Sequence, residues 1–292
     1  MQFTINWSPQ ARDLLRAGKI HIDRWKCPDW DDMIAQARED LPVYVHFPLV
    51  IGRGTLNQTD WGRVEQLMRD TDTPHVNLHL EPTRPALGDL NREALFAHCV
   101  EEVANVVKRF GADRVVVENI PYRTEHTHKF ADSVDTTFFS DLLIETGARL
   151  LLDVGHAQIS ANSLNHDLYP YLLAHPLDRL TEVHTAGVTA FTQAHIERAR
   201  QFDGFDAYFQ RFEGTNPLGM LMDHFGMGSE NDWEAFGWVL DRIREGSAKT
   251  PRLISYEYGG TGAPFAWRSE SDVIERDVPR FYAMVHSGVK TI

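Results

Sequence analysis

The sequence predicts a (β/α)8 barrel, in which eight parallel strands close into a cylinder covered by helices. Two observations support this prediction: short apolar runs rich in β-branched residues recur eight times, and helical patterns lie between them. The chain has no linker or low-complexity stretch, so we expect residues 1–292 to form a single domain. The expected strands cover residues 3–7, 20–25, 43–48, 76–81, 115–120, 150–154, 180–184 and 253–258.

Three of the expected helices have clear end signals. Residues 61–68 follow a threonine–aspartate pair that supplies the side-chain oxygen of an N-cap. Residues 91–110 carry apolar side chains at helical spacing and stop before Gly111. Residues 232–244 form a third amphipathic helix that closes near Gly246.

One irregular stretch, residues 188–231, separates the seventh and eighth expected strands. It is far longer than an ordinary loop, and such a loop in a compact domain is either functional or contains elements of its own. We expect a lid or substrate wall, or a plain helical insertion. Its aromatic residues are Phe191, Phe202, Phe205, Tyr208, Phe209, Phe212 and Phe225.

Composition excludes several classes of protein. The 29 basic side chains are outnumbered by 42 acidic ones, and the net charge of −13 argues against a long basic groove for nucleic acid. No apolar run approaches the roughly 18–20 residues of a membrane span, and the first residues lack the features of a signal peptide. Cys27 and Cys99 are the only cysteines and form no disulfide framework. We therefore expect a cytoplasmic protein of enzyme size.

Polar side chains stand at the ends of six consecutive expected strands. In this barrel the carboxyl ends of the strands form the face where ligands bind. Each residue alone is more simply explained as a hydrogen-bonded rim residue or a helix cap, but three carboxylates buried together require a cation. Histidine with carboxylate suits zinc, manganese or iron, so the sequence predicts a metal site here. The residues are His46, His79, Glu118, Asp153, His184 and Glu257.

These residues resemble those of the xylose-isomerase-like TIM barrels, a superfamily that includes endonuclease IV and sugar epimerases. Glu118, Asp153, His184 and Glu257 match the four-residue metal set of that superfamily. The resemblance follows most of the chain in order and is strongest over residues 115–187. It implies the barrel fold and a divalent metal ion as cofactor.

The resemblance also implies a second metal ion. His46 and His79 are similar to the two additional histidines of endonuclease IV, where a glutamate in the position of Glu118 bridges two ions. These histidines have no role in a one-metal epimerase. We therefore expect two or more ions of iron, zinc or manganese.

A third metal ion is implied by two short motifs. Residues 153–156 look like the D-x-x-H element of the superfamily, which ends here in His156. Residues 222–228 resemble its D-x-H-x-x-I-G element, in which His224 is the histidine. The first aspartate of this motif falls on Met222, a poor ligand for a hard cation, and the neighbouring Asp223 is the candidate substitute.

A different branch of the superfamily resembles residues 165–187. This stretch is similar to the multinuclear non-haem iron enzymes that remodel peptide cysteines during natural-product maturation. That branch usually carries two asparagines where this chain has Gly155 and His156. The resemblance implies a peptide as one class of substrate.

Several reactions are open at this site. Two metals bridged by Glu118 would support hydrolysis, and iron would add oxygen chemistry. With one metal, Glu118 and Glu257 would move a proton next to a carbonyl while His156 positions the substrate, as in a sugar isomerase or epimerase. We favour the enzyme with two or three metals, acting on a small, anionic or peptide substrate. The alternatives are the one-metal isomerase, a phosphodiesterase like the endonucleases that cut DNA at abasic sites, and a non-enzymatic scaffold.

Arginines and tryptophans near the same face are candidate substrate contacts. Arg53, Arg84 and Arg123 follow the third, fourth and fifth strands and suit a phosphate or carboxylate, although pairing with acidic side chains explains them equally well. Trp7 and Trp25 are expected to end the first two strands, where they wall a pocket or fill the core.

Overall fold

The computed structural model describes residues 1–202, 216–261 and 266–287, and its centre is a parallel sheet. The strand order is β3-β2-β1-β11-β8-β7-β6-β5-β4. The strands are β1 (Gln2–Asn6), β2 (Arg24–Cys27), β3 (Val43–Val45), β4 (Val50–Ile51), β5 (Val76–Leu80), β6 (Val115–Glu118), β7 (Arg149–Asp153), β8 (Leu180–Thr185) and β11 (Leu253–Tyr256).

The sheet closes because its two end strands belong to one short segment. Only residues 46–49 separate β3 from β4, which lie at opposite ends of the strand order. The amide of His46 donates to the Cys27 carbonyl, and that of His79 donates to the Leu49 carbonyl, both at 2.8 Å. β3 and β4 are therefore two pieces of one barrel strand. It is interrupted around Pro48, which has no amide to offer the ladder.

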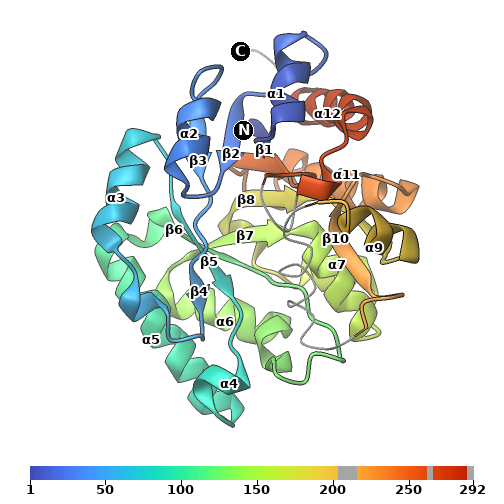
Figure 1. Ribbon diagram of the computed structural model, residues 1–292. Coiled ribbons are helices and arrows are strands. Elements are labelled where there is room, and N and C mark those ends of the chain that lie inside the picture. The colour runs from blue at the N-terminus through green and yellow to red at the C-terminus, as the bar shows by residue number, and fades with distance from the viewer. Residues whose placement is uncertain (203–215, 262–265, 288–292) are drawn as a thin grey trace.

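Helices cover the outside of this barrel, as Figure 1 shows. Two of them begin at side-chain caps: Asp60, one of the two residues that the sequence offers as a cap, accepts from the amide of Arg63, and Asn91 accepts from that of Ala94. The helices that frame the strands are α1 (Pro9–Arg16), α2 (Asp31–Ala37), α3 (Trp61–Asp70), α4 (Arg84–Leu87), α5 (Arg92–Phe110), α6 (Thr136–Thr146), α7 (Val154–Ser163), α8 (Leu168–Leu173), α11 (Glu230–Arg244) and α12 (Ser271–His286).

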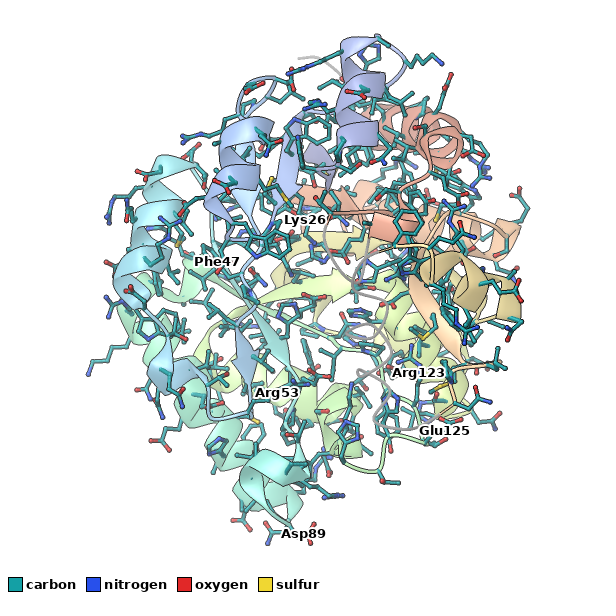
Figure 2. The ribbon with its side chains drawn as sticks, in the orientation of Figure 1. Lys26, Phe47, Arg53, Asp89, Arg123 and Glu125 are labelled. Atoms are coloured by element: carbon teal, nitrogen blue, oxygen red, sulfur yellow. The ribbon has the colours of Figure 1, made fainter. Side chains whose placement is uncertain are left out.

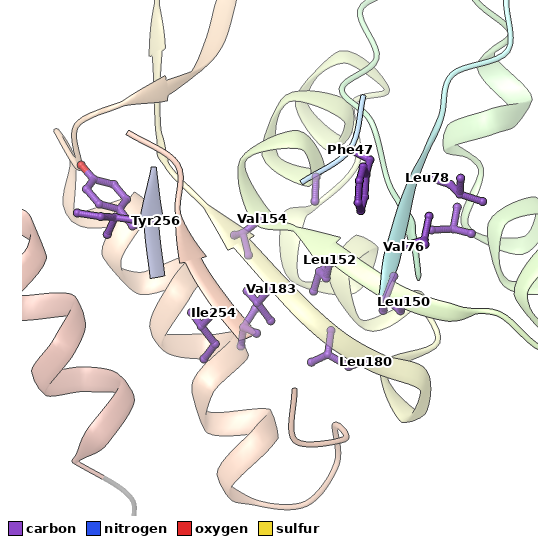
Figure 3. Packing of buried hydrophobic residues seen from close by; sticks show 14 of the residues in the cluster. Phe47, Val76, Leu78, Leu150, Leu152, Val154, Leu180, Val183, Ile254 and Tyr256 are labelled. Atoms are coloured by element: carbon purple, nitrogen blue, oxygen red, sulfur yellow. The ribbon is translucent and has the colours of Figure 1, made fainter. Parts of the chain in front are cut away.

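Alternation along the strands separates an apolar face from a polar one. Figure 3 shows the apolar face, where Leu152, Val183 and Ile254 are fully buried against the helices. Glu182 and Tyr44 lie inside the barrel, where the Tyr44 hydroxyl donates to Glu182 Oε1 at 3.0 Å. This hydrogen bond joins β3 to β8 across the closed sheet.

The long insertion builds a second, smaller sheet. β9 (Gly187–Ala190) follows β8 directly and pairs antiparallel with β10 (Leu221–Phe225), while α9 (Gln193–Ala199) lies between them in the sequence. Gly187 is required here, since a Cβ at this position would collide with the carbonyl of Gly226. Four of the insertion's aromatic residues lie outside the described residues: Phe205, Tyr208, Phe209 and Phe212.

The fold confirms the predicted (β/α)8 barrel and corrects one strand. The second strand is Arg24–Cys27 rather than residues 20–25, because Arg24, Trp25 and Lys26 pair with β1. Among the helices that the structure describes, none is both long and apolar enough to cross a membrane.

Candidate metal centre

Four side chains from the ends of neighbouring strands form the floor of the site. Glu118 of β6, Asp153 of β7, His184 of β8 and Glu257 after β11 offer ligand atoms that all lie within 4.8 Å of one another. His184 Nδ1 lies 3.2 Å from Glu257 Oε1 and 3.8 Å from Glu118 Oε1. All four residues are buried, so the carboxylates are close together and shielded from water.

A second group shares Glu118 with the first. His46, in the break between β3 and β4, and His79 on β5 direct Nε2 atoms at Glu118 Oε2, over 3.6 and 3.2 Å. The two Nε2 atoms lie 3.1 Å apart. The close approach follows from the interrupted third strand, which brings His46 beside β5.

A third group joins α7 to the insertion. His156 Nε2 lies 2.7 Å from Asp223 Oδ2, and His224 Nε2 lies 3.8 Å from the same oxygen. Asp223 and His224 are consecutive, and in a regular strand they would point to opposite faces. The register of β10 shifts between Met222 and Phe225, and His224 adopts a φ of 60°. This bulge lets both residues serve one group.

Three of the histidines are held in the orientation that metal ligands need. In each of them, Nδ1 lies beside a backbone carbonyl oxygen. The distances are 3.0 Å from His79 to Leu49, 2.8 Å from His156 to Asn119 and 2.8 Å from His224 to Glu257. A proton on Nδ1 satisfies each carbonyl and leaves the Nε2 lone pair facing the site.

The donor set fits divalent metal ions. Glu118 Oε2 and His46 Nδ1 are buried polar atoms without a hydrogen-bond partner, and buried polar atoms are normally paired. Burial alone would raise the pKa of Glu118, but His79, His184 and His156 together hold that pKa well below its usual value. Glu118 is therefore an ionised carboxylate surrounded by imidazoles, which is the ligand mix for iron, zinc or manganese.

The third group has a different charge state. The pKa of His156 is raised to about 10, because Asp153 and Asp223 outweigh the opposing effect of burial. The pKa of His224 falls to about 3, since burial outweighs Asp223. Without a metal ion, His156 is therefore protonated, and its positive charge offsets the negative charge of the third group.

Beneath the floor, a buried carboxylate orients His184. Glu182 Oε1 lies 2.7 Å from His184 Nε2, and its other oxygen pairs with His75. His75 and His184 hold the pKa of Glu182 well below its usual value against the effect of burial. The ionised Glu182 accepts the Nε2 proton of His184 and so leaves Nδ1 facing Glu257. Sequence reasoning missed Glu182, although its two-residue spacing from His184 places both on one face of β8.

Lys26 is a second residue beside the metal groups that sequence reasoning missed. It lies on β2, is 4% exposed and forms an ion pair with Glu257. Burial lowers the pKa of Lys26 to about 8, against the opposing effect of Glu182 and Glu118. Figure 2 shows Lys26 among the side chains over the middle of the barrel, whereas Asp89 lies at the periphery. Placing the second strand two residues later in the sequence would have found it.

A cavity of about 610 Å³ opens above these groups. Trp7 and Trp30 line one part of it, and Arg53, Arg123 and Lys129 line another. The cations have partners: Arg53 and Lys129 both pair with Glu81, and Arg123 donates to the Leu221 carbonyl. Further lining residues that the sequence analysis did not select include Arg268, His126 and His128.

Two candidate substrate contacts do not line the cavity and instead take the alternative roles that the sequence left open. Trp25 is fully buried in the apolar core, because the corrected second strand directs its neighbour Lys26 to the site instead. Arg84 lies in the short helix α4, stacks over Phe130 and donates to the Thr127 carbonyl, away from the cavity lining. Trp7, Arg53 and Arg123 do line the cavity.

Comparisons with known proteins agree with this geometry. Residues 19–207 match the family described as "RiPP precursor modification enzyme MbnB/TglH/ChrH". A UPF0276 protein of Acaryochloris marina is 27% identical over 162 residues, which cover 53% of this chain and 58% of that protein. The chain thus aligns with less than two thirds of the length of this relative.

Solved structures share the barrel. Endonuclease IV from Thermus thermophilus superposes with a TM-score of 0.53 at 14% identity, covering 98% of this chain and 100% of that one. D-allulose 3-epimerase from Methylomonas sp. gives 0.56 at 14% identity, covering 97% and 96%. At such identities the likeness establishes the fold alone, which is a TIM barrel.

Proposed function

Because the chain belongs to the MbnB/TglH/ChrH family of RiPP precursor modification enzymes, we propose that it modifies a ribosomally made precursor peptide at a centre of two or three metal ions. The observation that carries the proposal is the convergence of histidine and carboxylate side chains from separate strands into adjoining groups. A one-metal sugar epimerase would leave His46, His79 and His224 without a role. An endonuclease would need a duplex-wide basic surface that a net charge of −13 does not favour.

We assign the ligands by group. One ion would be held by His46, His79 and Glu118. A second would be held by Glu118, Asp153, His184 and Glu257, and a third by His156, Asp223 and His224. Glu118 belongs to the first two groups and would bridge their ions.

The bound ions would supply Lewis acidity and, with iron, electron transfer to oxygen. The surrounding residues supply position and protons. Glu118 and Glu257 line the cavity and supply negative charge that would hold the ions, and His156 would give up its proton on becoming a ligand. Lys26 forms an ion pair with Glu257.

The cavity suits a peptide side chain with an anionic group nearby. Trp7 and Trp30 offer apolar surface, and Arg53 and Lys129 offer positive charge that Glu81 only partly neutralises. A peptide or small molecule in the cytoplasm, rather than nucleic acid or a membrane, is the partner we propose, with residues 1–292 acting as one domain.

The test combines metal analysis with a substrate assay. The protein, purified without chelators, should contain two or three metal equivalents by elemental mass spectrometry. Iron-loaded protein incubated in air with cysteine-containing peptides encoded beside its gene should change the peptide mass. One metal equivalent together with turnover of D-allulose would instead establish an epimerase, and cleavage of abasic duplex DNA would establish a nuclease. Either result would overturn the proposal.

A further inference from the structure

One cation of the protein itself already sits in the four-residue group. Lys26 crosses from β2, on the far side of β1, to β11, where its Nζ forms an ion pair with Oε1 of Glu257. The same Nζ lies 3.2 Å from Nε2 and 3.4 Å from Nδ1 of His184. Glu257 and His184 are two of the four candidate ligands of one ion.

The lysine and a metal ion would share one oxygen atom. Glu257 Oε1, which pairs with Lys26, is also the oxygen that lies 3.2 Å from His184 Nδ1. An ion held between these two ligand atoms would stand beside the ammonium group. All three side chains are at most 7% exposed, so little water screens the repulsion between the two cations.

In the other two groups the nearest positive partners of the carboxylates are histidines. Among the residues that the structure describes, the ion pairs of Glu118 and Asp223 are formed by histidines alone. A histidine that gives up its proton becomes a ligand itself, whereas Lys26 must leave the shared oxygen, lose its proton or stay as a rival cation.

We propose that Lys26 is a built-in competitor for the metal ion at Glu257, so that the group Glu118, Asp153, His184 and Glu257 holds its ion more weakly than the two histidine-rich groups. This inference rests on the proposed metal centre. In this proposal Lys26 is a positioning residue that makes the metal affinities of the three groups unequal. Two ions stay bound, and the ion beside Glu257 exchanges with ions in solution.

The experiment is a Mn²⁺ titration of protein stripped of metal by a chelator, with free Mn²⁺ measured by electron paramagnetic resonance. The wild type should bind one equivalent at least tenfold more weakly than the others. Lys26→Met should tighten that equivalent at least tenfold, because Glu257 loses its cation. Lys26→Arg keeps the charge and should leave the equivalent weak.

The matched control is Lys129→Met. Lys129 is the other buried lysine of the cavity, and it pairs at 2.6 Å with Glu81, which belongs to none of the groups. Its replacement should leave all Mn²⁺ affinities unchanged. Should Lys26→Met fail to fold, Lys26→Gln, which also removes the charge, gives the same readout.

The possible outcomes separate this inference from the proposed function. Equal affinities in the wild type, or no tightening without the Lys26 charge, would overturn the inference and leave the metal-dependent function standing. A wild type that binds no Mn²⁺ beside a Lys26→Met variant that binds it would overturn both, because the two histidine-rich groups should hold their ions whatever residue stands at position 26. Absence of binding in both proteins would overturn both.

Discussion

His156 at the mouth of the barrel and His175 in its outer layer begin from the same local arrangement. Both are buried, and both place Nδ1 beside a backbone carbonyl oxygen, at 2.8 Å from Asn119 and 3.0 Å from Tyr171. Their pKa values move in opposite directions, to about 10 for His156 and about 4 for His175.

The neighbours of the two rings account for the difference. Burial lowers the pKa of both, but Asp153 and Asp223 reverse its effect at His156. The ring of His175 packs instead against Phe139 and Tyr171, so burial dominates. A buried histidine beside a backbone carbonyl becomes a candidate ligand only where a carboxylate approaches its other nitrogen, as Asp223 does at Nε2 of His156.

The largest expected effect comes from removing the carboxylate shared at the mouth. Glu118→Gln should cost at least one metal equivalent and lower peptide modification by about three orders of magnitude, because two groups lose their common anion. Elemental analysis and mass spectrometry of the peptide measure both effects. Glu102→Gln is the control, since this buried glutamate accepts from the Gly52 amide away from the site. Full metal content in Glu118→Gln would refute the shared role.

His175, in the outer layer, should affect how the free energy of unfolding changes as the pH falls. The folded pKa of His175, about 4, lies below the roughly 6.5 of an unfolded histidine, so the unfolded chain takes up the proton first as the pH falls. The stability that His175 contributes is complete above pH 6.5 and declines toward pH 4, by about 3 kcal/mol.

Urea unfolding of metal-free wild type and His175→Phe between pH 4 and 7 measures this effect. The variant, whose ring keeps the aromatic packing, should lose less stability on acidification. Equal slopes for the two proteins would show that His175 is not the residue responsible.

Measuring metal affinity after replacing each of the two histidines sharpens the comparison. His156→Ala should weaken metal binding in its group by about 10- to 100-fold, because Asp223 and His224 remain as the only ligands there. His175→Ala should leave metal affinity within about twofold, since no carboxylate converges on its ring. A metal titration of both variants decides, and equal losses would mean that the two histidines act alike.

The smallest expected effect is the release of a proton when the group of His156, Asp223 and His224 binds its ion. His156 is protonated in metal-free protein at neutral pH because its pKa is raised, and that proton must leave before Nε2 binds an ion. The metal affinity of this group should therefore rise from pH 7 to pH 10. Calorimetry in buffers of different ionisation enthalpy should detect roughly one proton released per ion, which His156→Ala should abolish.

Much of the site could be predicted because ligand positions follow from strand ends. His79, Glu118, Asp153 and His184 each close an apolar run, and the parallel barrel brings such ends to one face. The cap of α3 was equally local, since it depends on one side chain and an amide three residues later.

The rest depended on contacts between distant parts of the chain. Asp223 enters the site only because β10 pairs with β9 through a bulge that turns His224 to a φ of 60°. Trp25 lies in the core and Lys26 at the site because pairing with β1 ends the second strand at Cys27, two residues later than expected. No local pattern in the sequence carries that register.

By itself, the sequence determined the barrel, the order of its strands along the chain and most of the histidines and carboxylates at its mouth. These follow from the two-residue period of strands, which is encoded locally. Only the tertiary structure decided that Lys26 reaches Glu257, that Glu182 orients His184 and that Arg84 lies away from the cavity. Closure of the sheet decides those contacts, because it brings together strands that are far apart in the sequence.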